Sequence, residues 1–208
     1  MKNNFLKRVI SIFILAPIFI FFIFKGGLFF NFLLFCLFMF FVYEIYKLNI
    51  RFTKLLCILI ISIFLYSFHN LRKITDGMEI IFLAIFITWL SDIGGYVFGK
   101  LIGGKKINFI SPNKTISGFC GSIILVQLNL FYIEYLEKNL FKSLYINISF
   151  LFFCTLIVIF GDLFFSYIKR LNKIKDYSKL IPGHGGLLDR LDGFIFLIIT
   201  FYGINFLL

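Results

Sequence analysis

The sequence predicts an all-α, polytopic transmembrane helical bundle of about seven helices, with its N-terminus in the cytoplasm. Composition is the first reason: 61% of the 208 residues are hydrophobic and 15% are charged, whereas soluble domains have roughly 45–50% and about 25%. The second reason is a series of uncharged apolar runs near the ~20 residues that cross a bilayer as a helix. Seven such helices leave only short loops, which excludes a separate soluble domain.

The uncharged runs define the expected spans in order. They are residues 9–24, 26–43, 55–71, 80–99, 115–133, 143–161 and 193–208, and the fourth is interrupted only by Asp92. Backbone groups in hydrocarbon need partners within their own segment, and these runs lack the alternation of barrel strands, so each is expected to be a helix. The first run follows three basic residues like a signal peptide, but no small-residue cleavage site follows it, and we expect a retained helix.

Lys and Arg are distributed unequally on the two sides of these spans. The side with the N-terminus and the loops after the second, fourth and sixth spans holds 16 of the 21, and the other side holds 5. Cytoplasmic loops collect Lys and Arg, so the first side is expected to be cytoplasmic. The same rule explains the net charge of +11, and we expect no nucleic-acid partner.

Polar residues without a membrane-anchoring role gather in two cytoplasmic segments, about 100–116 and 166–192. We therefore divide the chain into N-terminal transmembrane helices (1–90) and a catalytic transmembrane region with polar loops (91–208). In the second segment, helical spacing puts Ser166 and Lys169 on the face of Asp162, with Arg170 beside them. An acid, a hydroxyl and a cation are then expected to point together.

The end of the second segment has the parts of a polyphosphate site. Gly185 and Gly186 can bring backbone N–H groups close to an anionic ligand. Asp189 and Asp192 are three residues apart and share a face of the first turn of the last helix. Because Mg²⁺ binds to one or two carboxylates together with substrate phosphates, this pair predicts a magnesium site. His184, between two glycines, is a candidate phosphate donor, although loop histidines more often have no such role.

Asp92 is a further functional candidate, because a carboxylate inside an apolar span is costly. The alternative is a polar pair with a neighbouring helix. Gly95 and Gly99 form a small-xxx-small pair, which predicts close helix packing and needs no ligand. Residues 99–106 meet part of the P-loop pattern, but Lys106 stands where Ser or Thr should bind Mg²⁺ and no strand precedes them, so we reject that motif.

Three blocks of sequence resemble one family. The run Ser166-Tyr-Ile-Lys-Arg, then Lys175-Asp176, Pro182-Gly-His-Gly-Gly and Asp189-Arg-Leu-Asp192, preceded by Gly161-Asp162-Leu163, resembles the signature of the phosphatidate cytidylyltransferases, also called CDP-diacylglycerol synthases. Ser91-Asp92-Ile-Gly-Gly-Tyr96-Val-Phe-Gly99-Lys100 and Ser111-Pro112-Asn-Lys114-Thr115-Ile-Ser-Gly118 are similar to two further blocks. The resemblance covers roughly residues 91–192, and the first ninety residues match only as apolar helices.

The resemblance implies a nucleotidyltransferase of phospholipid biosynthesis that converts CTP and phosphatidate to CDP-diacylglycerol and pyrophosphate with Mg²⁺. It implies a multi-pass protein of the cytoplasmic membrane with its active site facing the cytoplasm, and a homodimer is left open. The implied catalytic residues are Asp162, Lys169, Arg170, Lys175, Asp176, His184 and Arg190; the substrate-binding residues are Ser166, Gly185, Gly186, Lys114 and Ser111; the metal ligands are Asp189, Asp192, Asp162 and Asp92. Catalysis then consists mostly of positioning and charge stabilisation, because the nucleophile is already a phosphate oxyanion.

The sequence also departs from the family pattern. Asn113, Ile116 and Ser117 stand where a second Lys, an aromatic residue and an acid are common, and the chain is shorter than typical members, so reduced activity is one expectation. The alternatives are a related CTP-dependent lipid kinase, a cytidylyltransferase for another membrane lipid, or a small transporter. A transporter would place polar groups along several spans toward the midplane. A CDP-alcohol phosphatidyltransferase is excluded, because the residues after Asp192-Gly193 do not continue that family's motif.

Overall fold

The computed structural model describes residues 15–106, 114–135, 143–181 and 185–207. The described residues form a bundle of helices without a sheet. In chain order they are an unlabelled helix Leu15–Lys25, then α2 (Gly27–Tyr46), α3 (Arg51–Lys73), α4 (Gly77–Leu101), α5 (Ile116–Val126), α6 (Asn129–Tyr135), α7 (Leu144–Leu171) and α8 (Leu188–Leu207). The predicted all-α bundle is confirmed.

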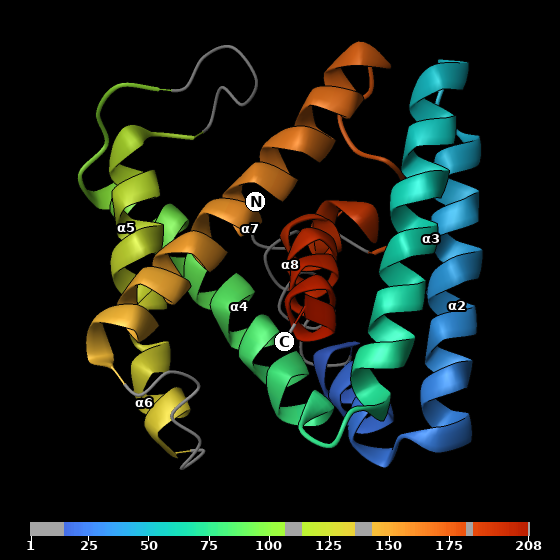
Figure 1. Ribbon diagram of the computed structural model, residues 1–208. Helices are drawn as coiled ribbons and strands as arrows, with labels where there is room; N and C mark the ends of the chain where they lie inside the picture. The colour runs from blue at the N-terminus through green and yellow to red at the C-terminus, as the bar shows by residue number, and fades with distance from the viewer. Residues whose placement is uncertain (1–14, 107–113, 136–142, 182–184, 208) are drawn as a thin grey trace.

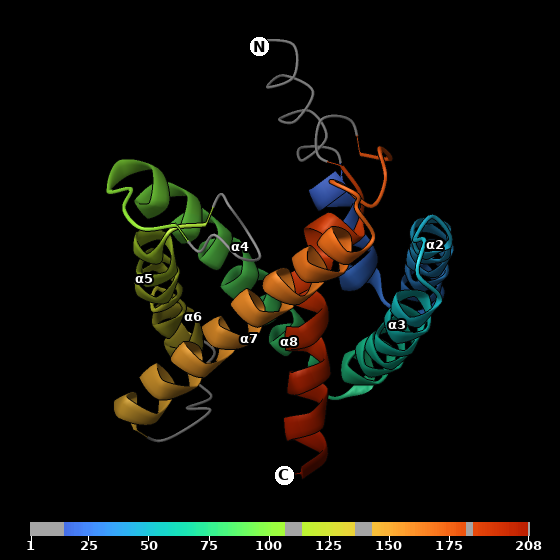
Figure 2. The same ribbon diagram turned by 90° about the horizontal axis from the view of Figure 1, so that it is seen from above.

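Helix α8 lies in the middle of the bundle. It packs against α3 on one side and against α4 and α7 on the other (Figures 1 and 2). Helices α4 and α5 form a closely packed pair, and the long α7 runs obliquely past them to reach α8 (Figure 2). The helix that brings Asp189 and Asp192 is therefore surrounded by the elements that bring the other candidate residues.

Each expected span has a helical counterpart among the described residues, but the ends differ. Helix α7 continues ten residues past 161, and α8 begins five residues before 193, because a helix can extend into water beyond its apolar run. The fifth span is divided between α5 and α6 at Gln127 and Leu128. Next to this break Asn129 Nδ2 donates to Val126 O at 2.8 Å, a local side-chain bond that competes with regular helix hydrogen bonding.

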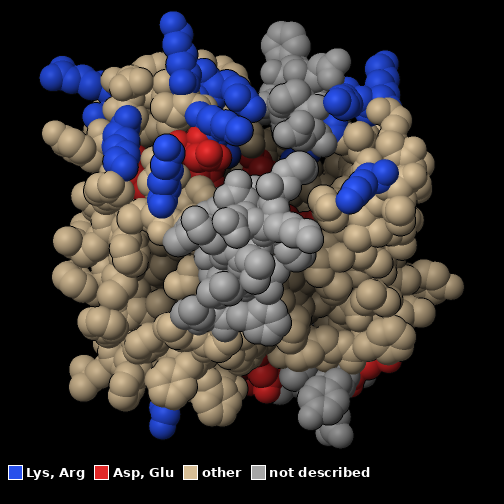
Figure 3. Space-filling model, turned by 180° about the vertical axis from the view of Figure 1, so that it is seen from behind, with Lys and Arg blue, Asp and Glu red and all other residues tan. Residues whose placement is uncertain are grey.

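The chain is a multi-pass membrane protein. Within the described part of the chain, five helical segments are long and apolar enough to cross a membrane: Gly27–Tyr46, Arg51–Lys73, Gly77–Leu101, Ile116–Glu134 and Leu144–Leu171. Large apolar side chains on their outer faces are exposed, as a hydrocarbon solvent requires. Figure 3 shows Lys and Arg gathered at one end of the molecule, above a broad uncharged belt.

One hydrophobic core joins the N-terminal helices to the C-terminal ones. Phe68 on α3 lies at its centre: its ring is 5.4 Å from that of Phe64 and 5.6 Å from that of Phe194 on α8. Phe19 of the first described helix completes the group, 6.3 Å from Phe68. Such aromatic pairs add to the stability gained from buried apolar area. The predicted division at residue 90 stays a prediction, and the two parts share this core.

The C-terminus of α7 is attached to the turn between α2 and α3 by one side chain. Asn172 Oδ1 accepts hydrogen bonds from the backbone N–H groups of Asn49 at 2.8 Å and Ile50 at 2.9 Å. Its Nδ2 donates to Thr53 Oγ1 at 3.0 Å. Helix α3 begins without another side-chain cap, so Asn172 satisfies donors there that would otherwise lack a partner. The charged end of α7 is thereby held beside α2.

Candidate active site

Asp162 lies on α7 where the apolar run gives way to polar residues. Its Oδ2 forms an ion pair with Lys114 Nζ, and Ser166 Oγ, one turn later, donates to its Oδ1 at 3.4 Å. The predicted meeting of Asp162 and Ser166 is confirmed. The side chains of Lys114 and Asp162 are 31% and 28% exposed, so the pair borders an open space.

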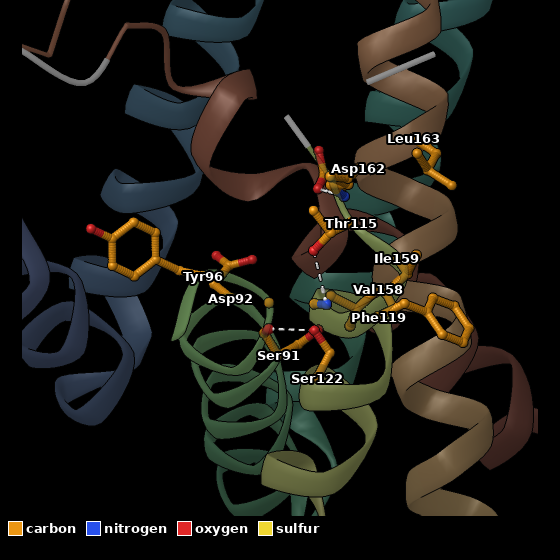
Figure 4. Close-up of a pocket in the computed structure, with 13 residues that line it drawn as sticks. Ser91, Asp92, Tyr96, Thr115, Phe119, Ser122, Val158, Ile159, Asp162 and Leu163 are labelled. Atoms are coloured by element: carbon orange, nitrogen blue, oxygen red, sulfur yellow. Dashed lines mark hydrogen bonds and ion pairs between the residues drawn. The ribbon is translucent and has the colours of Figure 1, made fainter. Parts of the chain in front are cut away.

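That space is a pocket of about 200 Å³ between α4, α5 and α7. Figure 4 shows Asp92 on α4 and Asp162 on α7 approaching it from different helices, with Thr115 between them. The wall is apolar toward the middle of the bundle, where it consists of Phe119, Val158 and Ile159. The pocket therefore has carboxylates and a lysine beside an apolar wall within the bundle, which suits a ligand with a charged headgroup and an apolar body.

Glycines allow α4 and α5 to approach closely enough to form this pocket. A Cβ built on Gly94 would lie 2.5 Å from Gly121 O, and one on Gly99 would lie 2.9 Å from Thr115 Oγ1. Ser122 Oγ of α5 donates to Ser91 O of α4 at 2.7 Å across the same contact. A Cβ on Gly95 would lie 3.2 Å from Ser122 Oγ, so the prediction that the small-xxx-small pair Gly95 and Gly99 packs helices is confirmed.

Asp189 lies at the start of α8 and is held by three donors. Lys169 Nζ is 2.6 Å from its Oδ1, while the backbone N–H groups of Tyr177 and Gly186 donate to Oδ2 at 3.0 and 2.9 Å. The side chain is only 5% exposed. Lys169, expected beside Asp162, is paired with Asp189 instead, because α8 packs on that side of α7.

A second carboxylate, Glu44 of α2, reaches the same region and is fully buried. Its Oε1 accepts from Ser178 Oγ at 2.6 Å and from Leu187 N at 2.7 Å, and its Oε2 accepts from Leu188 N at 2.8 Å. The first N–H groups of a helix lack intrahelical partners, so Glu44 caps α8 from a helix more than 140 residues away in sequence. We had not identified this residue from the sequence.

Gly185 and Gly186 provide the space for these two carboxylates. A Cβ on Gly186 would lie 2.6 Å from Glu44 Oε1 and 3.0 Å from Asp189 Oδ2. Gly185 has φ of +88°, a conformation that residues with a side chain rarely adopt. The Gly186 N–H, expected to face an anionic ligand, donates to Asp189 in this structure. A substrate contact of either glycine stays a prediction.

Asp192 follows Asp189 by one turn, and its Oδ1 accepts from Gly193 N at 2.8 Å. Its charged neighbours include Lys114, Lys169 and Asp189, and it is in turn a charged neighbour of Asp92. The close crossing of α7 and α8 explains this: a Cβ on Gly161 would lie 2.7 Å from Asp192 O. Carboxylates from α4, α7 and α8 thus converge near the pocket.

This donor set suits Mg²⁺ that also binds a substrate. Among the residues that the structure describes, no three His, Cys, Asp or Glu side chains are grouped as a complete metal site. Mg²⁺ needs only one or two protein carboxylates when phosphates supply further oxygens. Asp92 is exposed and has Asp192 among its charged neighbours, so these two carboxylates fit that requirement. Asp189 already accepts from three donors and fits it less well.

The electrostatic setting of Lys114 follows from its position before α5. Burial lowers the pKa of its ammonium group, while the nearby charges of Asp192 and Asp92 act in the opposite direction. The amine of Lys114 is therefore placed among the carboxylates of Asp92, Asp162 and Asp192.

The remaining candidate residues are more peripheral. Lys175 and Asp176 are exposed and line a hollow that also includes Tyr43 of α2 and Lys47, which directly follows α2. Arg170 and Arg190 are exposed as well, and Arg190 is among the charged neighbours of Asp92. Ser111 and His184 lie outside the described residues.

Residues 50–208 match the model of the cytidylyltransferase family, which is more than half of the chain. The chain belongs to the cytidylyltransferase family. It is 40% identical over 129 residues to a phosphatidate cytidylyltransferase of Staphylococcus haemolyticus, covering 60% of this chain and 48% of the relative. For the phosphatidate cytidylyltransferase of Staphylococcus epidermidis the identity is 40% over 139 residues, covering 63% and 50%. For that of Staphylococcus aureus it is 38% over 135 residues, again covering 63% and 50%. The chain spans about half the length of these relatives.

Ser117 and Glu44 each have a structural role. Ser117 donates from Oγ to Gly103 O and contacts Thr115 Oγ1 at 3.0 Å. A carboxylate could not donate this bond, so the hydroxyl has a structural task at the start of α5. Glu44 lies outside the matched residues 50–208. The signal that could have revealed it is its charge within an apolar helix, the same signal that identified Asp92.

Proposed function

We propose that this chain is a phosphatidate cytidylyltransferase, which transfers the cytidylyl group of CTP to phosphatidate and releases pyrophosphate. The observation that carries the proposal is the convergence of Asp92, Asp162 and Lys114 on one pocket, with Asp192 nearby. Membership of the cytidylyltransferase family and the names of the relatives at about 40% identity support the choice of reaction.

The reaction needs charge stabilisation more than proton transfer. A phosphate oxygen of phosphatidate attacks the α-phosphorus of CTP, and the bond to the β-phosphate oxygen breaks as pyrophosphate leaves. The nucleophile is already anionic at neutral pH, so no strong general base is required. Lys114, Lys169, Arg170, Lys175 and Arg190 are the proposed cationic contacts for triphosphate and headgroup, with Ser166, Ser111, His184, Gly185 and Gly186 as hydrogen-bonding contacts. Asp176 is proposed to orient Lys175, its neighbour in the chain.

Mg²⁺ is the proposed cofactor, with Asp92, Asp162, Asp189 and Asp192 as its candidate ligands. When bound, it would neutralise triphosphate charge and stabilise the departing pyrophosphate. Asp162 is paired with Lys114, so ligation by Asp162 would require Lys114 to turn toward the substrate phosphates. If Lys114 exchanged Asp162 for the substrate in this way, its ammonium group would lie beside the substrate phosphates.

The position of the pocket suits a lipid substrate. It lies between membrane helices, near the end where Lys and Arg gather (Figure 3), so a diacyl substrate could reach it from the bilayer while CTP arrives from water. We propose that this end faces the cytoplasm, as the positive-inside rule predicts, and that the membrane is the cytoplasmic membrane. Accessibility of single cysteines placed in the 47–50 turn and the 73–77 turn, measured in right-side-out vesicles, tests this orientation.

The test is an assay in detergent micelles with phosphatidate and CTP labelled either at the α-phosphate or at the γ-phosphate. Magnesium-dependent transfer of the α-label into the lipid phase is expected, and EDTA should abolish it. Transfer of the γ-label would identify a lipid kinase instead. No lipid label from a folded preparation with either nucleotide would reject nucleotide transfer to phosphatidate, and an acceptor series of other membrane lipids would then be assayed. Light scattering of the same preparation separates a monomer from a homodimer.

A further inference from the structure

Residues 177–181 and 185–188 are the described parts of the loop between α7 and α8. Two carboxylates lie side by side there, and each of them joins one part to the other. Asp189 accepts from Tyr177 N at the beginning and from Gly186 N at the end. Glu44 accepts from Ser178 Oγ at the beginning and from Leu187 N and Leu188 N at the end. Between these ties, Ile181 N donates to Gly185 O at 3.0 Å. The loop is thus fixed at both ends by acids from two different helices.

The buried charge of Glu44 must be compensated by other interactions. It has no exposed surface and belongs to α2, a helix of otherwise mostly apolar residues, where an uncompensated charge is costly. The cost is offset by three hydrogen bonds and by the favourable field at the N-terminus of α8. All of the donors that offset it belong to the loop or to the start of α8, so Glu44 and this segment stabilise each other.

The two carboxylates are coupled through Gly186. Its N–H donates to Asp189, and the position of its missing Cβ is 2.6 Å from Glu44 Oε1 and 3.0 Å from Asp189 Oδ2. If the backbone at Gly186 shifts relative to Glu44, the hydrogen bond from Gly186 N–H to Asp189 must therefore change as well. Asp189 in turn holds Lys169 at 2.6 Å. Glu44 is therefore connected to Lys169 through the backbone of residues 186–187 and the carboxylate of Asp189.

We propose that Glu44 is a positioning residue of the active site, through which α2 sets the geometry of Asp189 and Lys169. This inference rests on the proposed function for its catalytic meaning. It assigns a task in catalysis to a helix outside the residues that match the family model. It also explains why residues 185 and 186 are glycines without invoking a ligand, because a side chain at 186 would collide with the two carboxylates and residue 185 has a positive φ.

The test uses the full chain with Glu44→Gln, which keeps the shape of the side chain but replaces one acceptor with a donor. Glu134→Gln is the matched control, because Glu134 is an exposed carboxylate on α6, outside the proposed machinery. The rate of CDP-diacylglycerol formation is measured against Mg²⁺ concentration. We expect the half-activating Mg²⁺ concentration to rise about tenfold in Glu44→Gln, which corresponds to one lost hydrogen bond to a charged group. The control should match the parent.

This readout separates positioning from stability. A variant that only folds less well has fewer active molecules, so its maximal rate falls while its half-activating Mg²⁺ concentration stays at the parent value. An unchanged half-activating concentration in Glu44→Gln would overturn the proposal. If Glu44→Gln cannot be purified in folded form, Ser178→Ala carries the same test, because it removes one donor to Glu44 and leaves both helix N–H bonds in place. A shift of up to about tenfold is then expected, since this variant also loses one hydrogen bond to the charged group.

Hydrogen exchange of the backbone amides provides a second readout without substrate or metal. Faster exchange at Leu187 or Leu188 is expected in any case, because Gln keeps only one of the two oxygens that accept from these amides. Positioning predicts that exchange also rises at Tyr177 and Gly186, which are bound to Asp189 and not to Glu44. Exchange confined to Leu187 and Leu188 would reject the coupling. If the parent forms no CDP-diacylglycerol, the proposed function fails, and this exchange pattern alone decides whether Glu44 sets the geometry of Asp189.

Discussion

Lys169 on α7 and Asp189 on α8 form an ion pair with 2.6 Å between Nζ and Oδ1, and their side chains are 16% and 5% exposed. Asp189 also accepts from two backbone N–H groups. The same side chain is therefore a proposed metal ligand and part of the internal packing between two helices. Asp189 differs in this respect from Asp92, whose side chain is exposed in the pocket.

We expect Asp189→Asn to lower both activity and stability. Removing one partner of a buried ion pair leaves the other charge uncompensated, at a cost of about 3–5 kcal/mol. Thermal unfolding in detergent should show a lower Tm than for the parent, while Glu134→Gln, an exposed carboxylate control, should show none of this loss. A parent-like Tm for Asp189→Asn would mean that Lys169 finds another partner.

Asp92→Asn is expected to remove activity and leave Tm close to that of the parent. The side chain is exposed in the pocket and is not part of the helix contact made by Ser91. Loss of a group that stabilises charge in the transition state should lower kcat by about a hundredfold or more. Poor expression together with a low Tm would instead assign Asp92 to helix packing.

Gly94→Ala should disrupt the contact between α4 and α5. The added Cβ would lie 2.5 Å from Gly121 O, and such overpacking costs about 1–3 kcal/mol. Gly203→Ala in α8 is the control, because no atom lies within 4 Å of the added Cβ and Ala favours a helix by up to about 1 kcal/mol. Thermal unfolding of the two variants should therefore shift in opposite directions. A drop in both would indicate a general effect of substitution.

The pH dependence of the rate should reflect Lys114. Its pKa is lowered from the ordinary value of 10.5 by burial, so the ammonium group loses its proton at a lower pH than an exposed lysine. If the proposed phosphate contact requires the charged form, kcat/KM should fall as pH rises, beginning below pH 10.5. Lys114→Arg, which stays charged, should move this fall to higher pH. The same alkaline limb in both proteins would exclude Lys114 as its cause.

Much of the fold was predictable because the bilayer thickness sets the length of a membrane-spanning helix, and the helical period sets which residues share a face. The apolar runs gave the spans, and i+4 spacing correctly joined Asp162 to Ser166. The prediction for Lys169 was less successful: the spacing placed it on the face of Asp162, but a long side chain can turn to either neighbour. Lys169 forms its ion pair with Asp189, and only the packing of α8 beside α7 brings that carboxylate within reach.

The residues of α2 show where sequence reasoning stopped. Glu44 was passed over because its neighbours match nothing but an apolar helix, and the partners that explain it are Ser178, Leu187 and Leu188. Ser117 was noted only as a departure from a family pattern. Its hydroxyl proved to donate to Gly103 O, a contact between a loop and a helix that no local spacing encodes.

The sequence by itself determined that this protein is a helical membrane bundle, which face carries the charge and which family its polar segments resemble. Composition, period and motif are local properties, and the absence of water in hydrocarbon makes them decisive. Only the tertiary structure decided which acids remain open to a pocket and which are consumed by internal hydrogen bonds. Asp92 and Asp189 look alike in sequence, but one faces a cavity and the other satisfies three buried donors, because side-chain partners across helices depend on packing in three dimensions.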